Sequence, residues 1–315
     1  MPGRQAGPHD SLFRWTFSSP ENAASELRAV LPPGLTGRLD LDRLIPVPGT
    51  FVDEDLRQRH TDVLYTAPLD GRDAYLYVLM EHQSTSDPLM AYRMARYMMK
   101  IWDRYLREHP GARRLPAVIP LVVYTGKSRW SAPVRLQDLI DLVPVGGEEA
   151  ADYMPRFSFL LDDLSAVDPA ELRARDVTVE VRVSMLSFVH VPGNARLHEA
   201  PQDWRDDLRA LVDEPDGDLK LAAQMAYIMR KGETPASDLA SLFASLGPDA
   251  EKVYMTTADM LKASEEARAI LRNLKNRGVS VDEHSRDRIA SCLDAETLDT
   301  WLDRSVEITE IAELF

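Results

Sequence analysis

The sequence predicts an α/β core with a central mixed sheet flanked by helices, followed by an all-helical C-terminal region. Residues 61–83 alternate between apolar and polar positions with the period of two that a strand requires. Residues 115–124 form an almost unbroken apolar run of strand length, which indicates an interior strand covered on both faces. From Pro169 onward the apolar residues recur at helical spacing instead. These patterns place the sheet in the first half of the chain and helices in the second.

Two helices are predicted ahead of the first strand. The first eight residues are rich in Gly and Pro and are expected to form a disordered leader. Asp10-Ser11 could then cap a short apolar helix. A second helix is expected from Ser19-Pro20 to about Leu31, because Ser is a good capping residue and Pro suits the first turn.

Residues 61–83 (TDVLYTAPLDGRDAYLYVLMEHQ) are interpreted as a hairpin of two antiparallel strands that turns at Asp70-Gly71. An Asp-Gly pair between two alternating runs is a strong signal for a two-residue hairpin turn. Counting outward from this turn puts Asp62 opposite Leu79. The backbone register of the hairpin therefore follows from the local sequence alone.

This register brings oxygen-bearing side chains to one end of the sheet. Asp62 and Glu81 become diagonal neighbours on one face, and Gln83 follows Glu81 on the same face. Hard divalent ions such as Mg²⁺ prefer oxygen ligands of this kind. The sequence thus predicts a metal site formed by Asp62 and Glu81.

A third metal ligand could come from the segment just before the hairpin, residues 51–60. Either Glu54 or Asp55 could supply it. The alternative is that Asp55 pairs with Arg57 or Arg59, or faces water.

A long helix is predicted after the hairpin, because Asp87 provides a cap and Pro88 a first turn, and apolar residues follow at helical spacing to about Glu108. Basic residues recur every three or four positions and so share a broad face of this helix. They are Arg93, Arg96, Lys100, Arg104 and Arg107.

The stretch from Met90 to Arg135 is cationic within an acidic protein. It holds ten basic and two acidic residues, a local net charge of +8, whereas the whole chain has a net charge of −14. A cationic zone beside a predicted metal site favours a polyanion such as DNA. For any single residue, the alternative is an ordinary solvated surface charge. The expected nucleic-acid contacts are Arg93, Arg96, Lys100, Lys127 and Arg129.

Acidic residues also follow the last predicted strand, residues 157–161. Asp162 and Asp163 could bind metal, but a role in starting the next helix is favoured. Lys127, just after the interior strand, could contact phosphate or replace a catalytic lysine, or could be a surface lysine.

An acid in one strand and an acid-x-polar tripeptide ending the next strand resemble the PD-(D/E)XK nuclease superfamily. The tripeptide here is Glu81-His82-Gln83, with glutamine in place of the usual lysine. The runs PHDSLFRWTFSSPENAASEL, YVLMEHQS and LPAVIPLVVYTGK resemble the Rpn family of recombination-promoting nucleases, also described as transposase-like, over about the first 190 residues. In that family the ExQ form is familiar, as is a Tyr-x-Gly step, matched here by Tyr124 and Gly126.

The resemblance implies a restriction-endonuclease-like core and a Mg²⁺-dependent DNA endonuclease. Asp62 and Glu81 would hold Mg²⁺, for which Mn²⁺ or Ca²⁺ could substitute, and Gln83 would position the attacking water. The alternative is a weak or inactive nuclease-fold protein that binds nucleic acid or a partner protein. Overall acidity and Gln83 favour the alternative, whereas the two retained carboxylates and the cationic zone favour the enzyme.

Composition excludes several other classes. A single cysteine, Cys292, excludes an internal disulfide and a cysteine-rich zinc site, and a reducing cytoplasmic location is expected. No apolar run approaches the length of a membrane span, and the start lacks the apolar segment of a secretion signal. Nucleotide-loop and dinucleotide-binding motifs are absent, so no organic cofactor is expected. The oligomeric state stays open, with a homodimer as one candidate.

The expected domain organisation has four parts. They are the leader (1–8), a PD-(D/E)XK nuclease-like domain (9–212), a linker and helix (213–234), and a helical C-terminal domain (235–315).

Overall fold

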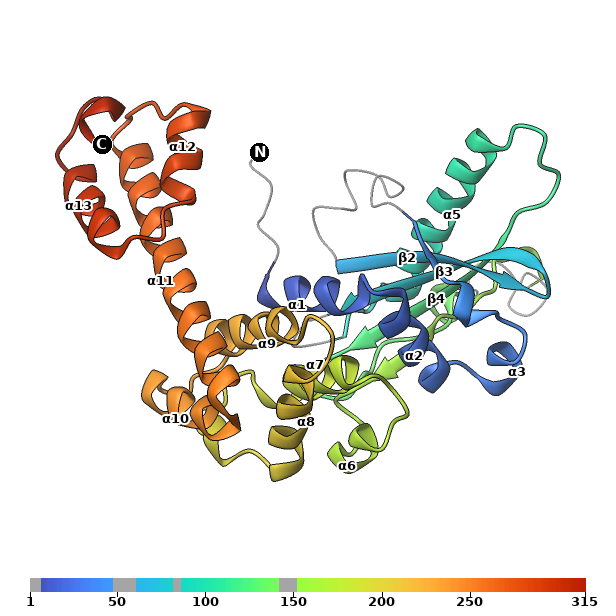
Figure 1. The fold of residues 1–315 in the computed structure, drawn as a ribbon. Helices are drawn as coiled ribbons and strands as arrows, with labels where there is room; N and C mark the ends of the chain where they lie inside the picture. Colours follow the sequence, from blue (N-terminus) through green and yellow to red (C-terminus); the bar gives the residue numbers. More distant parts are fainter. Residues whose placement is uncertain (1–6, 48–60, 82–85, 142–151) are drawn as a thin grey trace.

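The computed structural model describes residues 7–47, 61–81, 86–141 and 152–315. In this part of the chain five strands form one sheet in the order β1-β2-β3-β4-β5. They are β1 (Ile45–Pro46), β2 (Thr61–Leu69), β3 (Arg72–Glu81), β4 (Ala117–Tyr124) and β5 (Leu160–Asp163). The first three pair antiparallel and the last three parallel. The predicted α/β class, with a mixed sheet flanked by helices and a helical C-terminal region, is confirmed (Figure 1).

The hairpin of β2 and β3 has the predicted register. Asp70 and Gly71 both have positive φ angles, 49° and 76°, as the two-residue type I′ turn requires. Leu69 pairs with Arg72 across this turn, and Asp62 pairs with Leu79 near the other end.

Helix α5 (Met90–Glu108) connects β3 to β4 and covers one face of the sheet (Figure 1). Its buried residues Met94, Tyr97 and Ile101 share a core with Tyr75 of β3 and Val122 of β4. Asp87 is not the N-cap as predicted, because Leu89 holds that position without a side-chain capping bond. Asp87 Oδ1 instead accepts a hydrogen bond from the backbone N–H of Leu89 at 2.8 Å, just before the helix. The helix begins at Met90, two residues after the predicted Pro88.

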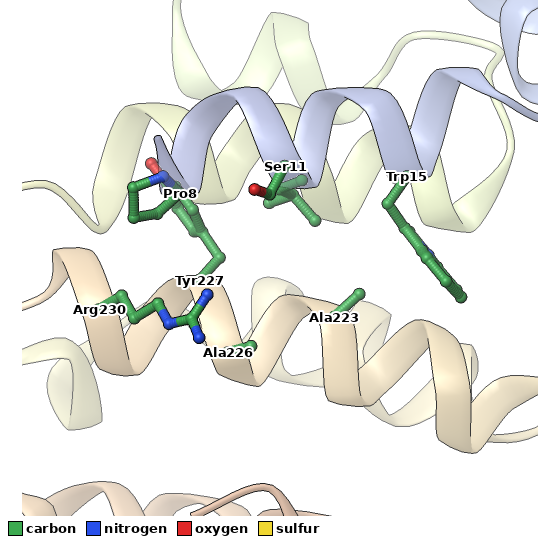
Figure 2. A pocket seen from close by; sticks show the side chains of 8 residues that line it. Pro8, Ser11, Trp15, Ala223, Ala226, Tyr227 and Arg230 are labelled. Carbon is green, nitrogen blue, oxygen red and sulfur yellow. The ribbon is translucent and has the colours of Figure 1, made fainter. Parts of the chain in front are cut away.

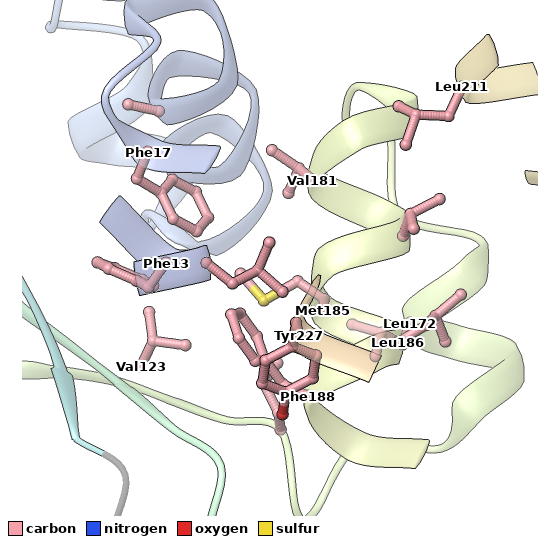
Figure 3. Close-up of a cluster of buried hydrophobic side chains, with 14 of the residues drawn as sticks. Phe13, Phe17, Val123, Leu172, Val181, Met185, Leu186, Phe188, Leu211 and Tyr227 are labelled. Atoms are coloured by element: carbon pink, nitrogen blue, oxygen red, sulfur yellow. The ribbon is translucent and has the colours of Figure 1, made fainter. Parts of the chain in front are cut away.

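The opposite face of the sheet is covered by α1 (Pro8–Phe17), α2 (Pro20–Val30) and α7 (Val179–His190). Figure 3 shows side chains of α1 and α7 packed against each other beside Val123 of β4. The helices α8 (Gln202–Val212), α9 (Gly217–Lys231) and α10 (Ala236–Leu246) extend the same core.

The N-terminal helices are close to the predicted ones. Helix α1 begins at Pro8, ahead of the predicted cap at Asp10, and Asp10 Oδ2 instead accepts the N–H of Gly7 at 3.1 Å. Helix α2 is capped as predicted, with the hydroxyl of Ser19 accepting from the N–H of Asn22 at 3.4 Å. The predicted leader is described only from Gly7 on, so residues 1–6 lie outside the described part.

The C-terminal region is built on α11 (Pro248–Asn276), whose 29 residues span about 44 Å. Its first turns pack with α9 and α10, and its second half packs with α12 (Glu283–Ala290) and α13 (Ala295–Ser305) in a separate core that runs from Ala263 to Leu314. Figure 1 shows α11 carrying these terminal helices away from the sheet. The hydrophobic core therefore divides within α11 and not at Pro235, because α10 contributes to the larger core. The domain boundaries themselves stay a prediction.

Short elements complete the described chain: α3 (Pro33–Thr36), η1 (Leu41–Arg43), η3 (Leu136–Leu139), α6 (Pro169–Arg173), η6 (Leu197–Glu199) and η7 (Ile311–Glu313). Among the helices of the described residues, none is both long and apolar enough to cross a membrane.

Candidate active site at one end of the sheet

Four strands bring polar residues to the same end of the sheet. Strand β2 begins there with Thr61, and β3, β4 and β5 end there with Glu81, Tyr124 and Asp163. The register pairs Glu81 with Tyr124 and Tyr124 with Asp163. These three positions form a row across the sheet, which we call the strand-end row.

The row and Asp62 share one face of the sheet. Asp62 pairs with Leu79, and Leu79 lies two residues before Glu81, so the positions of Asp62 and Glu81 are diagonal neighbours on that face. Val122, two residues before Tyr124, belongs to the core beneath α5. The candidate site is thus at the end of the α5-covered face.

The described structure reaches the two predicted ligands only through their backbone. The side chains of Asp62 and Glu81 lie outside the described part, as do Gln83, Glu54 and Asp55 entirely. Their roles in metal binding and catalysis stay predictions. Among the described residues, no group of three or more His, Cys, Asp or Glu side chains could hold a metal ion.

Asp163 holds the loop that follows β4. Its Oδ2 accepts the backbone N–H of Trp130 at 2.7 Å, and its Oδ1 accepts the N–H and the hydroxyl of Ser165 at 3.1 and 2.6 Å. The Trp130 ring packs edge-on against Tyr124, with 5.0 Å between the ring centroids. Asp163 does not start a helix, because α6 begins only at Pro169.

The Tyr-x-Gly step has a steric explanation in this loop. The Tyr124 side chain is fully buried and lies against the backbone of Gly126. A Cβ at residue 126 would sit 1.9 Å from the Tyr124 hydroxyl oxygen and 2.1 Å from Cζ, far inside contact distance. The glycine therefore lets the chain pass the ring and present Lys127 and Arg129, which are both exposed.

The Asp162 side chain lies on the opposite face of the sheet, where it contacts Arg175. Its two oxygens accept from Nη1 and Nη2 of Arg175 at 2.8 and 2.7 Å, and Glu26 Oε1 lies 3.2 Å from Arg175 Nη1. All three side chains are largely buried. Burial raises the pKa of Glu26 well above its ordinary value, and the charge of Asp162 raises it further. Asp162 is thus part of a buried ion-pair network, and neither predicted alternative, a metal ligand or a helix start, describes it.

The predicted nucleic-acid contacts differ in exposure and pairing. Arg93 Nη1 forms an ion pair with Asp87 Oδ2 at 2.6 Å, and both side chains are mostly buried. Arg96 is exposed and lies over the Tyr92 ring at 6.0 Å, and Lys100 is half-buried. Asp87 lies just before the cationic stretch that begins at Met90, and its negative charge offsets that of Arg93. Arg93 therefore adds little to the positive charge of this surface.

A cavity of about 170 Å³ lies elsewhere, between α1 and α9 (Figure 2). Its wall is mostly apolar and includes Trp15 and Ala223, with Ser11 and Arg230 as polar members. None of the predicted site residues lines it.

Residues 7–216 match the model of a family described as "Putative transposase, YhgA-like". The match covers the described sheet, its strand-end row and the helices on both faces. The chain belongs to this YhgA-like family. The resemblance to recombination-promoting, transposase-like proteins is thereby confirmed.

Curated relatives of this YhgA-like chain are named as recombination-promoting nucleases or as inactive nuclease-like proteins. Over 81% of the chain it is 31% identical to Recombination-promoting nuclease RpnD of Escherichia coli O157:H7, covering 94% of that protein. It is 37% identical to Recombination-promoting nuclease RpnA of Escherichia coli K12 over 38% of the chain and 40% of that protein. A further relative from Escherichia coli K12 is named Inactive recombination-promoting nuclease-like protein RpnE. The chain is 33% identical to it over 53% of the chain and 54% of RpnE. No solved structure matches the chain.

Proposed function

We propose that this chain is a metal-dependent DNA endonuclease of the recombination-promoting type, with its active site at the strand-end row. The observation that carries the proposal is the pairing of Asp62 with Leu79, two residues from Glu81, in a chain whose relatives are named nucleases. Diagonal positions in an antiparallel pair lie about 7–8 Å apart, a span that two carboxylates can bridge through one ion. The donor chemistry therefore fits Mg²⁺, or Mn²⁺ or Ca²⁺ in its place.

In this proposal Asp62 and Glu81 hold the ion, with Glu54 or Asp55 as a further ligand. The bound ion would lower the pKa of a coordinated water and offset charge on the phosphodiester. Gln83 orients the attacking water through its amide but brings no positive charge of its own. Lys127 and Arg129 contact substrate phosphates from the exposed loop after β4.

The test is nicking of supercoiled plasmid by the full chain with Mg²⁺. Asp62→Asn removes one ligand charge and is expected to lower the cutting rate by about 100-fold or more. The matched control is Asp303→Asn, the same change at an exposed position of α13, which should cut like the wild type. Equal cutting by wild type and Asp62→Asn would overturn the assignment of Asp62.

A second candidate function is a catalytically weak or inactive protein that binds nucleic acid or a partner protein. The printed name of RpnE and the glutamine at residue 83 favour it. It predicts metal-independent binding of DNA with no nicking by the wild type. Binding that persists unchanged in Asp62→Asn, without cutting by either protein, would select this candidate.

A further inference from the structure

The outer surface of α5 carries a line of exposed side chains that we call the α5 stripe. Its members are Tyr92, Arg96, Met99, Asp103 and Leu106. They follow one another at intervals of four, three, four and three residues, which aligns them along one side of a helix, as in a heptad seam.

The stripe is unusually apolar for a solvent-facing surface. Tyr92, Met99 and Leu106 are 50%, 55% and 42% exposed. Helix α5 makes its main described contacts with β4 and η3, through the side that faces the sheet (Figure 1). Three large apolar side chains in one line, away from that core, are typical of a helix that packs against a further helix.

The order of residues in the stripe is self-complementary about Met99. Tyr92 lies seven residues before Met99 and Leu106 seven residues after it, whereas Arg96 lies three before and Asp103 four after. A two-fold axis at Met99 therefore brings Tyr92 of one subunit to Leu106 of the other, and Arg96 to Asp103, with each contact made twice. The charged pair is offset by one residue, which amounts to about 1.5 Å along the helix, a distance that an arginine side chain spans.

We propose that the α5 stripe is the interface of a homodimer, in which two α5 helices pack antiparallel around a two-fold axis at Met99. Charge complementarity favours a second copy as the occupant, because the stripe has one cation and one anion that the axis brings together. The Tyr92 ring, 6.0 Å from the Arg96 guanidinium, keeps that cation within the stripe. Methionine at the axis suits a contact with its own copy, since its flexible side chain adapts to the space.

The dimer changes the role expected for Arg96 and brings together two subunits that each carry a candidate active site. Arg96 becomes an interface residue and not a phosphate contact, which leaves exposed Lys127 and Arg129 for the substrate. Both candidate sites lie on the sheet faces that the paired α5 helices cover. A single helix pair about 28 Å long is smaller than a standard interface, so the dimer is expected to be weak and concentration-dependent.

The experiment is sedimentation velocity of the full chain, without nucleic acid, over a wide concentration range. The wild type is expected to convert reversibly from monomer to dimer. Arg96→Asp alone or Asp103→Arg alone creates two like-charged contacts and should weaken association by about tenfold or more. The two changes combined in one chain, or the two single variants mixed in equal amounts, restore opposite charges and should restore association.

Arg113→Asp is the matched control, because it makes the same charge change at an exposed position in the loop after α5. It should associate like the wild type. Restoration in the mixture also excludes misfolding as the cause of the single-variant effects. The proposal is overturned by a wild type that stays monomeric throughout, by a dimer that the single reversals leave unchanged, or by a combined variant as dissociated as the singles.

Discussion

Replacing Gly126 by alanine should destabilise the loop that follows β4. The new Cβ would lie 1.9 Å from the Tyr124 hydroxyl oxygen, whereas carbon and oxygen atoms pack at about 3.5 Å, so ring and backbone must separate by roughly 1.5 Å. Tyr124 has no room to retreat, because it is fully buried against Trp130. Overpacking of this kind costs about 2–3 kcal/mol, which corresponds to a melting temperature lowered by about 4–10 °C.

The assay is thermal unfolding of Gly126→Ala beside Gly111→Ala. Gly111 lies in the loop after α5, where an added Cβ meets no atom within 4 Å and the φ angle is not positive. Its replacement should be neutral or slightly stabilising, because alanine reduces the freedom of the unfolded chain. The difference between the two variants measures the contact with Tyr124.

A double-mutant cycle identifies the cause. Tyr124→Leu alone should destabilise through the cavity that it leaves, and combining it with Gly126→Ala should cost clearly less than the sum of the two changes. Strict additivity, or a Gly126→Ala protein that melts like Gly111→Ala, would refute the steric argument.

Two further predictions concern the carboxylates of Glu26 and Asp163. A raised pKa in the folded state means that the stability linked to protonated Glu26 is fully present below the ordinary carboxyl pKa and is lost as pH rises through the raised value. Arg175 favours the ionised form of Glu26, but burial and the charge of Asp162 outweigh it. The Glu26→Gln variant should therefore lose less unfolding free energy than the wild type between acidic and alkaline pH. Parallel losses of the two proteins in denaturant titrations would contradict this. In Asp163→Asn the amide cannot accept all three hydrogen bonds that the carboxylate accepts. The free energy of unfolding should fall by about 1–3 kcal/mol in the same titrations, and the fluorescence of Trp130 should change. An unchanged midpoint and spectrum would show that the loop does not depend on this carboxylate.

Local sequence determined the hairpin and, through it, the candidate site. A two-residue turn at Asp70-Gly71 leaves one register, so the pairing of Asp62 with Leu79 follows from neighbours in the chain. The α5 helix and the β4 strand were predictable for the same reason, since the period and length of an apolar pattern are read within one segment.

Only the tertiary structure decided which acidic residues serve the fold. Asp162 and Asp163 are adjacent in sequence, yet the strand alternation sends them to opposite faces, one toward Arg175 and the other toward the backbone of Trp130. Glu26 meets Arg175 across 149 residues. The physical reason is that partner choice for a buried charge depends on which surfaces the whole chain brings together, and no local pattern encodes that. The division of the core within α11 depends on the same long-range packing.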